Sequence, residues 1–207
     1  TRVLSKPWRS LWKLVPKLKF DYENNQSEHK TYSEIVTRLL LSNKAPVLES
    51  LHLEFEVGKC RSVDVGMWIG IAYARRVRKL VLHPISEKGY FRFPTSLYNC
   101  ETLESLTLIS WVCIDVPSKV CLKSLRTLLG IFVLMLDSSP KLQVLKLIGE
   151  WRIANNRLAI RSWNQPKNVL GCLLFHLETF MWKGCKRLGE DEKEVAKYIL
   201  IPKEHKS

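Results

Sequence analysis

A short apolar phrase recurs along this chain and constrains its fold more than any other feature. The phrase has the spacing L-x-x-L-x-L, and its copies begin at Leu48, Val77, Leu103, Leu122 and Leu142, with a weaker copy at Leu177. Its last two apolar positions alternate, as they do in a strand with one buried face. One such unit cannot bury its own apolar face, so the copies must stack side by side as parallel strands.

The segments between the copies differ in length. First positions are separated by 29, 26, 19, 20 and 35 residues, so the returns between strands must differ in structure. Apolar periodicity and end signals predict helices over Tyr32–Leu41, Ser62–Arg76 and Asp191–Leu200. We therefore expect an α/β fold, an irregular leucine-rich-repeat solenoid with short parallel strands and helical or irregular returns.

The chain is strongly basic, with 33 Lys and Arg against 20 Asp and Glu and a net charge of +13 over 207 residues. Such a charge favours nucleic acid, anionic membranes or acidic proteins without choosing among them. The densest patches are 75–79 and the N-terminal segment, and a solvated basic surface is the simpler interpretation. The longest apolar run, Leu128–Leu136, has nine residues, which is too short to predict a membrane-spanning helix.

The sequence carries no recognisable catalytic or metal-binding motif. The five His and six Cys show no H-E-x-x-H, no C-x-x-C and no His–carboxylate grouping with ligand spacing, and phosphate-cradling glycine loops are absent. We expect no enzymatic activity, no cofactor and no metal. The non-leucine positions of the strand phrases, such as His52, Glu54, Thr107 and Lys146, are expected to line an exposed binding face.

Three segments of the chain carry patterns that point to one family. The opening stretch has the L-S-x-x-W-x-x-L-W pattern of the end of an F-box, with Leu4, Trp8, Leu11 and Trp12 at its apolar positions. The irregular repeats follow. The C-terminal block resembles the FBD motif through W-x-x-P, C-L-x-x-H-L-E-x-F-x-W and E-x-E-x-A-x-Y-I-L, which place Trp163, Pro166, Cys172, Leu177, Phe180, Trp182 and Tyr198.

Together these segments resemble the plant F-box/FBD/leucine-rich-repeat family, and the resemblance implies a domain order and a function. Residues 1–20 would be the C-terminal remnant of an F-box, 21–150 the irregular leucine-rich repeats, and 151–207 an FBD region that caps the solenoid. Family members are thought to be substrate-recognition subunits of SCF-type ubiquitin ligases. Leu4, Trp8, Leu11 and Trp12 would then face a Skp-type adaptor in a cullin complex, and the repeats would bind a protein substrate. The FBD residues would be structural.

Two other interpretations stay open. The chain could be a non-catalytic interaction module whose F-box does not work, because the family's F-box begins well before Thr1 and the chain resembles a fragment. Leu4, Trp8, Leu11 and Trp12 also lie on one helical face with cations beside them and Pro16 ending the helix, as in a membrane-surface helix. Pro7, Arg9 and Lys13 interrupt any signal-peptide core, so an intracellular location, cytoplasmic or nuclear, is expected.

Overall fold

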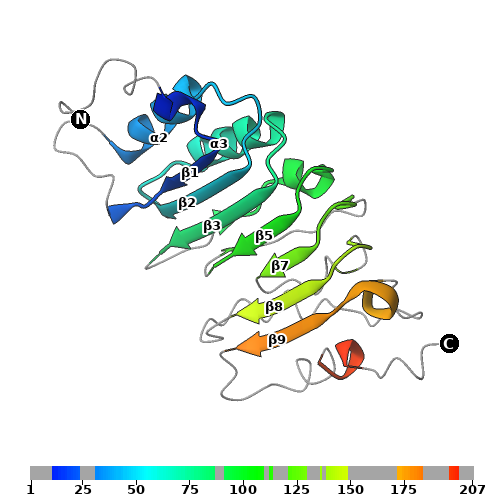
Figure 1. The fold of residues 1–207 in the computed structure, drawn as a ribbon. Helices are drawn as coiled ribbons and strands as arrows, with labels where there is room; N and C mark the ends of the chain where they lie inside the picture. Colours follow the sequence, from blue (N-terminus) through cyan, green and yellow to red (C-terminus); the bar gives the residue numbers. More distant parts are fainter. Residues whose placement is uncertain are drawn as a thin grey trace.

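The computed structural model describes residues 11–23, 31–86, 91–109, 112–113, 121–129, 136, 139–148, 172–183 and 196–200. These residues form an α/β fold around one open sheet (Figure 1), whose seven strands run in the order β1-β2-β3-β5-β7-β8-β9. Every pairing in this sheet is parallel. The strands are β1 (Lys17–Phe20), β2 (Ser50–Glu56), β3 (Lys79–Ile85), β5 (Ser105–Leu108), β7 (Thr127–Leu129), β8 (Val144–Ile148) and β9 (Thr179–Lys183).

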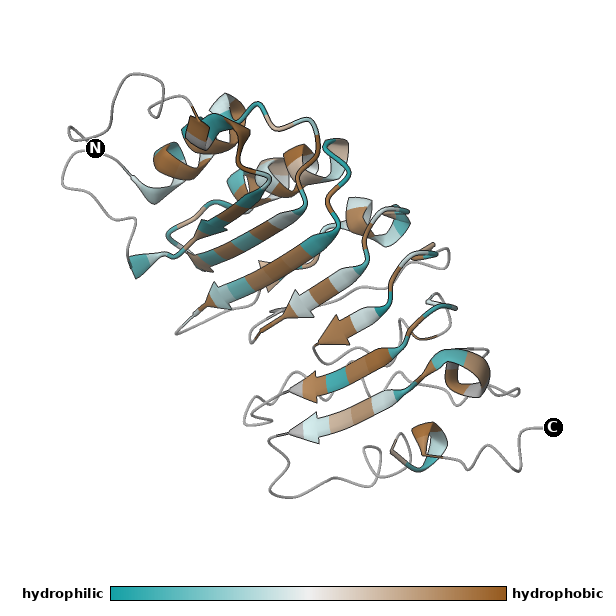
Figure 2. Ribbon diagram, viewed as in Figure 1, coloured by the Kyte–Doolittle hydropathy of each residue, from teal (hydrophilic) through white to brown (hydrophobic). Residues whose placement is uncertain are grey.

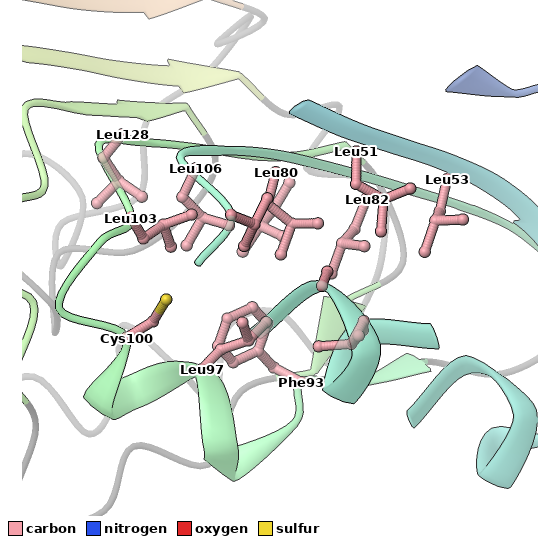
Figure 3. Close-up of a cluster of buried hydrophobic side chains, with 14 of the residues drawn as sticks. Leu51, Leu53, Leu80, Leu82, Phe93, Leu97, Cys100, Leu103, Leu106 and Leu128 are labelled. Atoms are coloured by element: carbon pink, nitrogen blue, oxygen red, sulfur yellow. The ribbon is translucent and has the colours of Figure 1, made fainter. Parts of the chain in front are cut away.

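The leucines of the repeated phrase form rows across the sheet, as predicted. One row runs through Leu51, Leu80, Leu106, Leu128 and Leu145, which are paired in register and fully buried. Figure 3 shows Leu51, Leu80, Leu106 and Leu128 side by side beneath their strands, with Leu103 beside Leu106 and Leu97 on the short helix opposite the row. Alternation along each strand therefore separates a buried apolar face from an outward face, and the strands in Figure 2 are banded accordingly.

One copy of the phrase was assigned to the wrong leucine. The spacing of the phrase predicts a copy that starts at Leu122, and such a copy would place Leu125 in the buried row. In the structure the residue that pairs with Leu106 and Leu145 is Leu128, so this copy starts at Leu125. Leu122 and Leu125 are both buried in the turn before β7. Because leucines recur at 122, 125 and 128, the spacing of the phrase fits a start at either Leu122 or Leu125.

The first strand of the sheet was missed altogether. Residues 17–20 lie in the segment assigned to the F-box remnant, yet they pair in parallel with β2, from Lys17 beside Ser50 to Phe20 beside Leu53. Their phrase is Val15-x-x-Leu18-x-Phe20, a further copy of the repeat. The resemblance assigns this phrase to the F-box remnant, whereas its cations at 17 and 19 lie on the outward face of a strand.

Two helices cover the inward face of the first strands (Figure 1). Helix α2 (Tyr32–Ser42) starts with a capping box, in which the Thr31 hydroxyl accepts from the Glu34 amide and the Glu34 carboxylate accepts from the Thr31 amide. Helix α3 (Ser62–Ala74) starts after Arg61, which makes no side-chain cap. Both helices were predicted within two residues of their ends. Their apolar side chains join the strand leucines in one core.

Shorter elements complete the described parts of the chain. They are the 3-10 helices η1 (Trp12–Leu14) and η3 (Thr95–Asn99), the π-helix η5 (Cys172–His176), and a two-stranded parallel sheet of β4 (Phe91–Arg92) and β6 (Val112–Cys113). Residues 196–199 are helical, and they agree with the end of the helix predicted over Asp191–Leu200, whose first residues lie outside the described part. None of the described helices is long and apolar enough to cross a membrane.

Candidate interaction surface

The outward face of the sheet presents side chains in register from strand to strand. One row contains Lys19, His52, Val81, Thr107, Leu129, Lys146 and Met181. A neighbouring row contains Lys17, Ser50, Lys79, Ser105, Thr127, Val144 and Thr179. We call these two rows the strand face. The positions predicted to line it, His52, Thr107 and Lys146, share the first row, and Glu54 lies two residues beyond His52 on β2.

The strand face has a chemistry suited to binding a protein segment. One row carries the hydroxyl groups of Ser50, Ser105 and Thr127, with the exposed cation of Lys79 between Ser50 and Ser105. The other row carries half-buried apolar side chains such as Leu129. Hydroxyl groups can donate and accept hydrogen bonds, and apolar side chains favour binding when they are buried away from water. Protein interfaces usually combine both kinds of contact. The face spans seven parallel strands, so it can contact an extended partner along its length.

At the β1–β3 end, acidic groups meet histidines beside the strand face. Glu54 lies opposite His83 across the β2–β3 pair, and the Glu54 Oε2 to His83 Nδ1 distance is 3.0 Å. Asp21 directly follows β1, and its carboxylate lies 2.9 Å from the Lys19 ammonium. Burial, followed by the positive charge of Lys19, lowers the pKa of His52 below its ordinary value. Both effects disfavour the charged imidazolium form of His52.

This grouping corrects the expectation that no His–carboxylate set has ligand spacing. Ligand atoms of Asp21, His52 and Glu54 all lie within 4.8 Å of one another. The signal present in the sequence was H-x-E on a predicted strand, since residues two apart share a face. The third member, Asp21, is brought to the set by the register of β1, a strand that the repeated phrase did not predict.

The basic patch at 75–79 is partly used inside the fold. Both terminal nitrogens of the Arg75 guanidinium donate to Asn43, one to its side-chain oxygen at 2.8 Å and one to its carbonyl. The Arg78 guanidinium lies 3.3 Å from the carboxylate of Glu104, the residue that directly precedes β5. Two cations of the patch thus have structural partners, which weakens the interpretation of this patch as a nucleic-acid site.

The predicted adaptor-facing residues lie at the start of the described chain. Leu4 and Trp8 are outside the described residues, and Trp12 opens η1. Leu11 is 45% exposed and Leu14 is 53% exposed, so apolar surface remains open at this end. The helical stretch ends before Pro16, as predicted, and β1 begins directly after it.

Comparison with known proteins decides the family. An FBD-associated F-box protein of Arabidopsis thaliana is 34% identical to this chain, and the match covers 97% of the chain and 80% of that relative. This chain belongs to the plant F-box/FBD/leucine-rich-repeat family. The family model described as FBD matches residues 165–200 of this F-box/FBD/leucine-rich-repeat protein. No solved structure matches the chain.

Two further relatives cover smaller parts. An F-box/LRR-repeat protein of Arabidopsis thaliana is 81% identical over 128 residues, which are 62% of this F-box/FBD/leucine-rich-repeat protein and 42% of the relative. An F-box/FBD/LRR-repeat protein of the same plant is 53% identical over 143 residues, and the match covers 67% of this chain and 31% of that protein. The chain thus spans less than half of these two curated relatives.

Within the matched FBD segment, the described motif residues pack at the β9 end of the sheet. Phe180 and Trp182 lie on β9 in register with Leu145 and Leu147, and their rings meet edge to face at 6.2 Å. Leu177 also packs against the core, and Tyr198 is buried. Cys172 is the first residue of η5, whereas Trp163 and Pro166 lie outside the described residues. The structural role of the motif stays a prediction.

Proposed function

We propose that this chain is a substrate-recognition subunit of an SCF-type ubiquitin ligase, which binds a target protein through its repeats. The observation that carries the proposal is the strand face: outward side chains continue in register over seven parallel strands in a member of an F-box family. The parallel sheet is then the strand side of a leucine-rich-repeat solenoid. Repeat solenoids bind partners along such extended surfaces.

The mechanism would be proximity rather than chemistry. The N-terminal segment would bind a Skp-type adaptor in a cullin complex, and the strand face would hold the target beside the ubiquitin-conjugating enzyme. The subunit itself would make and break no bond, and it would act inside the cell, in the cytoplasm or nucleus. The exposed apolar side chains of Leu11 and Leu14 support an adaptor contact at this end, because exposed apolar groups gathered at one place mark interaction sites.

Adaptor binding is tested by co-elution with a Skp-type adaptor on size exclusion. The variant is the double substitution Trp8→Ala, Leu11→Ala, and the matched control is Phe175→Ala, which removes a 75% exposed aromatic side chain from η5 instead. We expect a complex with the unmodified chain and the control, and none with the double variant. A folded, monodisperse chain that never co-elutes contradicts the ligase role and leaves a non-catalytic interaction module.

The target-binding half is tested separately on the strand face. Thr107→Glu and Lys146→Glu place new negative charges in the middle of the first row, where both positions are half-buried and outward. We expect these variants to keep adaptor binding and to lose target ubiquitination in a reconstituted ligase, while Glu101→Lys, on the exposed turn before β5, keeps both. If both variants support target ubiquitination as well as the unmodified chain does, the target does not bind the strand face.

A further inference from the structure

A second kind of site is built at the β1–β2 edge of the sheet. His52 and Glu54 point to the same side because they are two residues apart on β2. Lys19 pairs with His52 and Phe20 with Leu53, so the chain continues to Asp21 beside Glu54. Asp21, His52 and Glu54 therefore form one cluster. Their ligand atoms lie within 4.8 Å of one another, and all three residues are half-buried.

A histidine on the next strand supports this set. His83 lies opposite Glu54 in the β2–β3 register, and its Nδ1 lies 3.0 Å from Glu54 Oε2. A ligand that is itself held by a neighbouring hydrogen bond keeps its orientation, and such outer contacts are a regular part of metal sites. The carboxylate of Glu54 is therefore positioned before any ion arrives.

The Nε2 atom of His52 is a buried nitrogen with no hydrogen-bond partner among the described residues. Buried polar atoms without partners are uncommon, because each loses its contact with water and gains nothing in return. An ion bound among these three side chains would give such an atom a partner.

We propose that Asp21, His52 and Glu54 bind one divalent transition-metal ion, of which Zn²⁺ is the representative. One imidazole with two carboxylates matches Zn²⁺, whereas Mg²⁺ and Ca²⁺ select sets made of oxygen alone. Two ligands of one tetrahedral Zn²⁺ lie about 3.3–3.6 Å apart. The three ligand atoms now lie within 4.8 Å of one another, so side-chain rotations would have to close this spacing when an ion binds.

The competing occupant of the site is the Lys19 ammonium, which lies 2.9 Å from Asp21 Oδ1. The Lys19 side chain is 61% exposed, so it can swing into water at small cost when an ion arrives. With three protein ligands, one coordination position stays available to water or to a side chain of a bound protein. Since Asp21 follows β1 and the other two ligands lie on β2, the ion would also join the edge strand to its neighbour.

The test is a Zn²⁺ titration of the full chain by calorimetry, with Mg²⁺ as the comparison ion. The variants are His52→Gln and Asp21→Asn, and His176→Gln, which removes an exposed histidine from η5, is the matched control. All cysteines stay in place in every variant, so any Zn²⁺ that they bind cancels in the comparison. We expect both ligand variants to lose one Zn²⁺ per chain or to bind it at least tenfold more weakly, and the control to be unchanged.

Two further variants keep the proposal testable if a ligand variant fails to fold. His83→Gln removes the contact to Glu54, and its affinity for Zn²⁺ should fall about 10-fold to 100-fold. Lys19→Met removes the competing cation, and its affinity should rise. A titration in which His52→Gln, Asp21→Asn and Lys19→Met all match the unmodified chain would overturn the proposal, as would equal affinity for Mg²⁺ and Zn²⁺. These results do not depend on adaptor or target binding.

Discussion

The indole Nε1–H of Trp68 donates to Thr37 Oγ1 at 2.9 Å and joins helix α3 to helix α2. Trp68 is fully buried, and the ring of Tyr32 packs edge to face against it at 6.0 Å. A buried indole needs an acceptor for its N–H. These two contacts link the helices under the first strands.

Replacing the acceptor tests this contact. Thr37→Val keeps the shape of the side chain but leaves the buried indole N–H without its acceptor, so we expect the free energy of unfolding to fall by about 1–3 kcal/mol. Chemical denaturation measures the change. Thr37→Ser keeps the hydroxyl and should cost less than Thr37→Val. In a double-mutant cycle Trp68→Phe should remove most of the effect of Thr37→Val, and full additivity would contradict the contact.

The corrected register of β7 predicts opposite results for adjacent leucines. Leu128 is fully buried in the leucine row, whereas Leu129 lies on the strand face. We expect Leu128→Ala to lower the free energy of unfolding by about 2–5 kcal/mol, because it leaves a cavity in the core. Leu129→Ala should cost less than about 1 kcal/mol. Urea unfolding of both variants measures the difference, and the reverse order would show a one-residue shift of the strand.

The buried phenol of Tyr32 should make the free energy of unfolding depend on pH in the alkaline range. Its hydroxyl donates to the carbonyl of Glu54, and burial, followed by the negative charges of Cys60 and Glu54, raises its pKa well above the ordinary value of 10.0. The unfolded chain ionises this phenol near pH 10 while the folded chain does not. The resulting stability is fully present below pH 10 and is lost as the pH rises above it.

The Tyr32→Phe variant separates the two effects. At neutral pH it should lose about 1–3 kcal/mol, because the Glu54 carbonyl loses its donor. Above pH 10 its stability should fall less steeply than that of the unmodified chain, by up to about 1.4 kcal/mol per pH unit. Thermal unfolding followed by circular dichroism measures both. Tyr73→Phe, on the exposed side of α3, should change stability at neutral pH by less than about 0.5 kcal/mol. Identical alkaline slopes for Tyr32→Phe and the unmodified chain would contradict the assignment.

The hydrogen bonds of Asn43 indicate which cation of the basic patch contributes to stability. This buried residue donates its amide to the Val15 carbonyl at 3.0 Å, and its side-chain oxygen accepts from Arg75 and from the Ala45 amide. It thereby holds the segment before β1 against the ends of both helices. We expect Arg75→Ala to lower the free energy of unfolding by about 1–3 kcal/mol.

Arg78→Ala is the matched control for that change. It removes the same charge, but its pair with Glu104 is exposed, with side-chain exposures of 58% and 38%, so the loss should stay below about 1 kcal/mol. Both substitutions should weaken retention on heparin equally if only net charge matters. A larger loss of stability from Arg78→Ala than from Arg75→Ala, measured by denaturation, would contradict the role of Asn43.

The sequence alone determined the elements whose signals are local. Alternating apolar positions identified β2, β3, β5, β8 and β9, and apolar periodicity with end signals located α2 and α3, because the side-chain periods of strands and helices are visible within one segment. The motif residues also led to the correct family, since the F-box and FBD patterns are short and specific.

Tertiary structure decided the relations between segments. Whether Leu125 or Leu128 enters the buried row depends on the neighbouring strands, since both leucines are buried and both fit the phrase. The strand at 17–20 forms because β2 offers it a partner, although its own sequence also suits a helix end. Only that pairing brings Asp21 beside His52 and Glu54. Contacts across a parallel sheet are fixed by register, and register depends on the packing of the whole core rather than on any single segment.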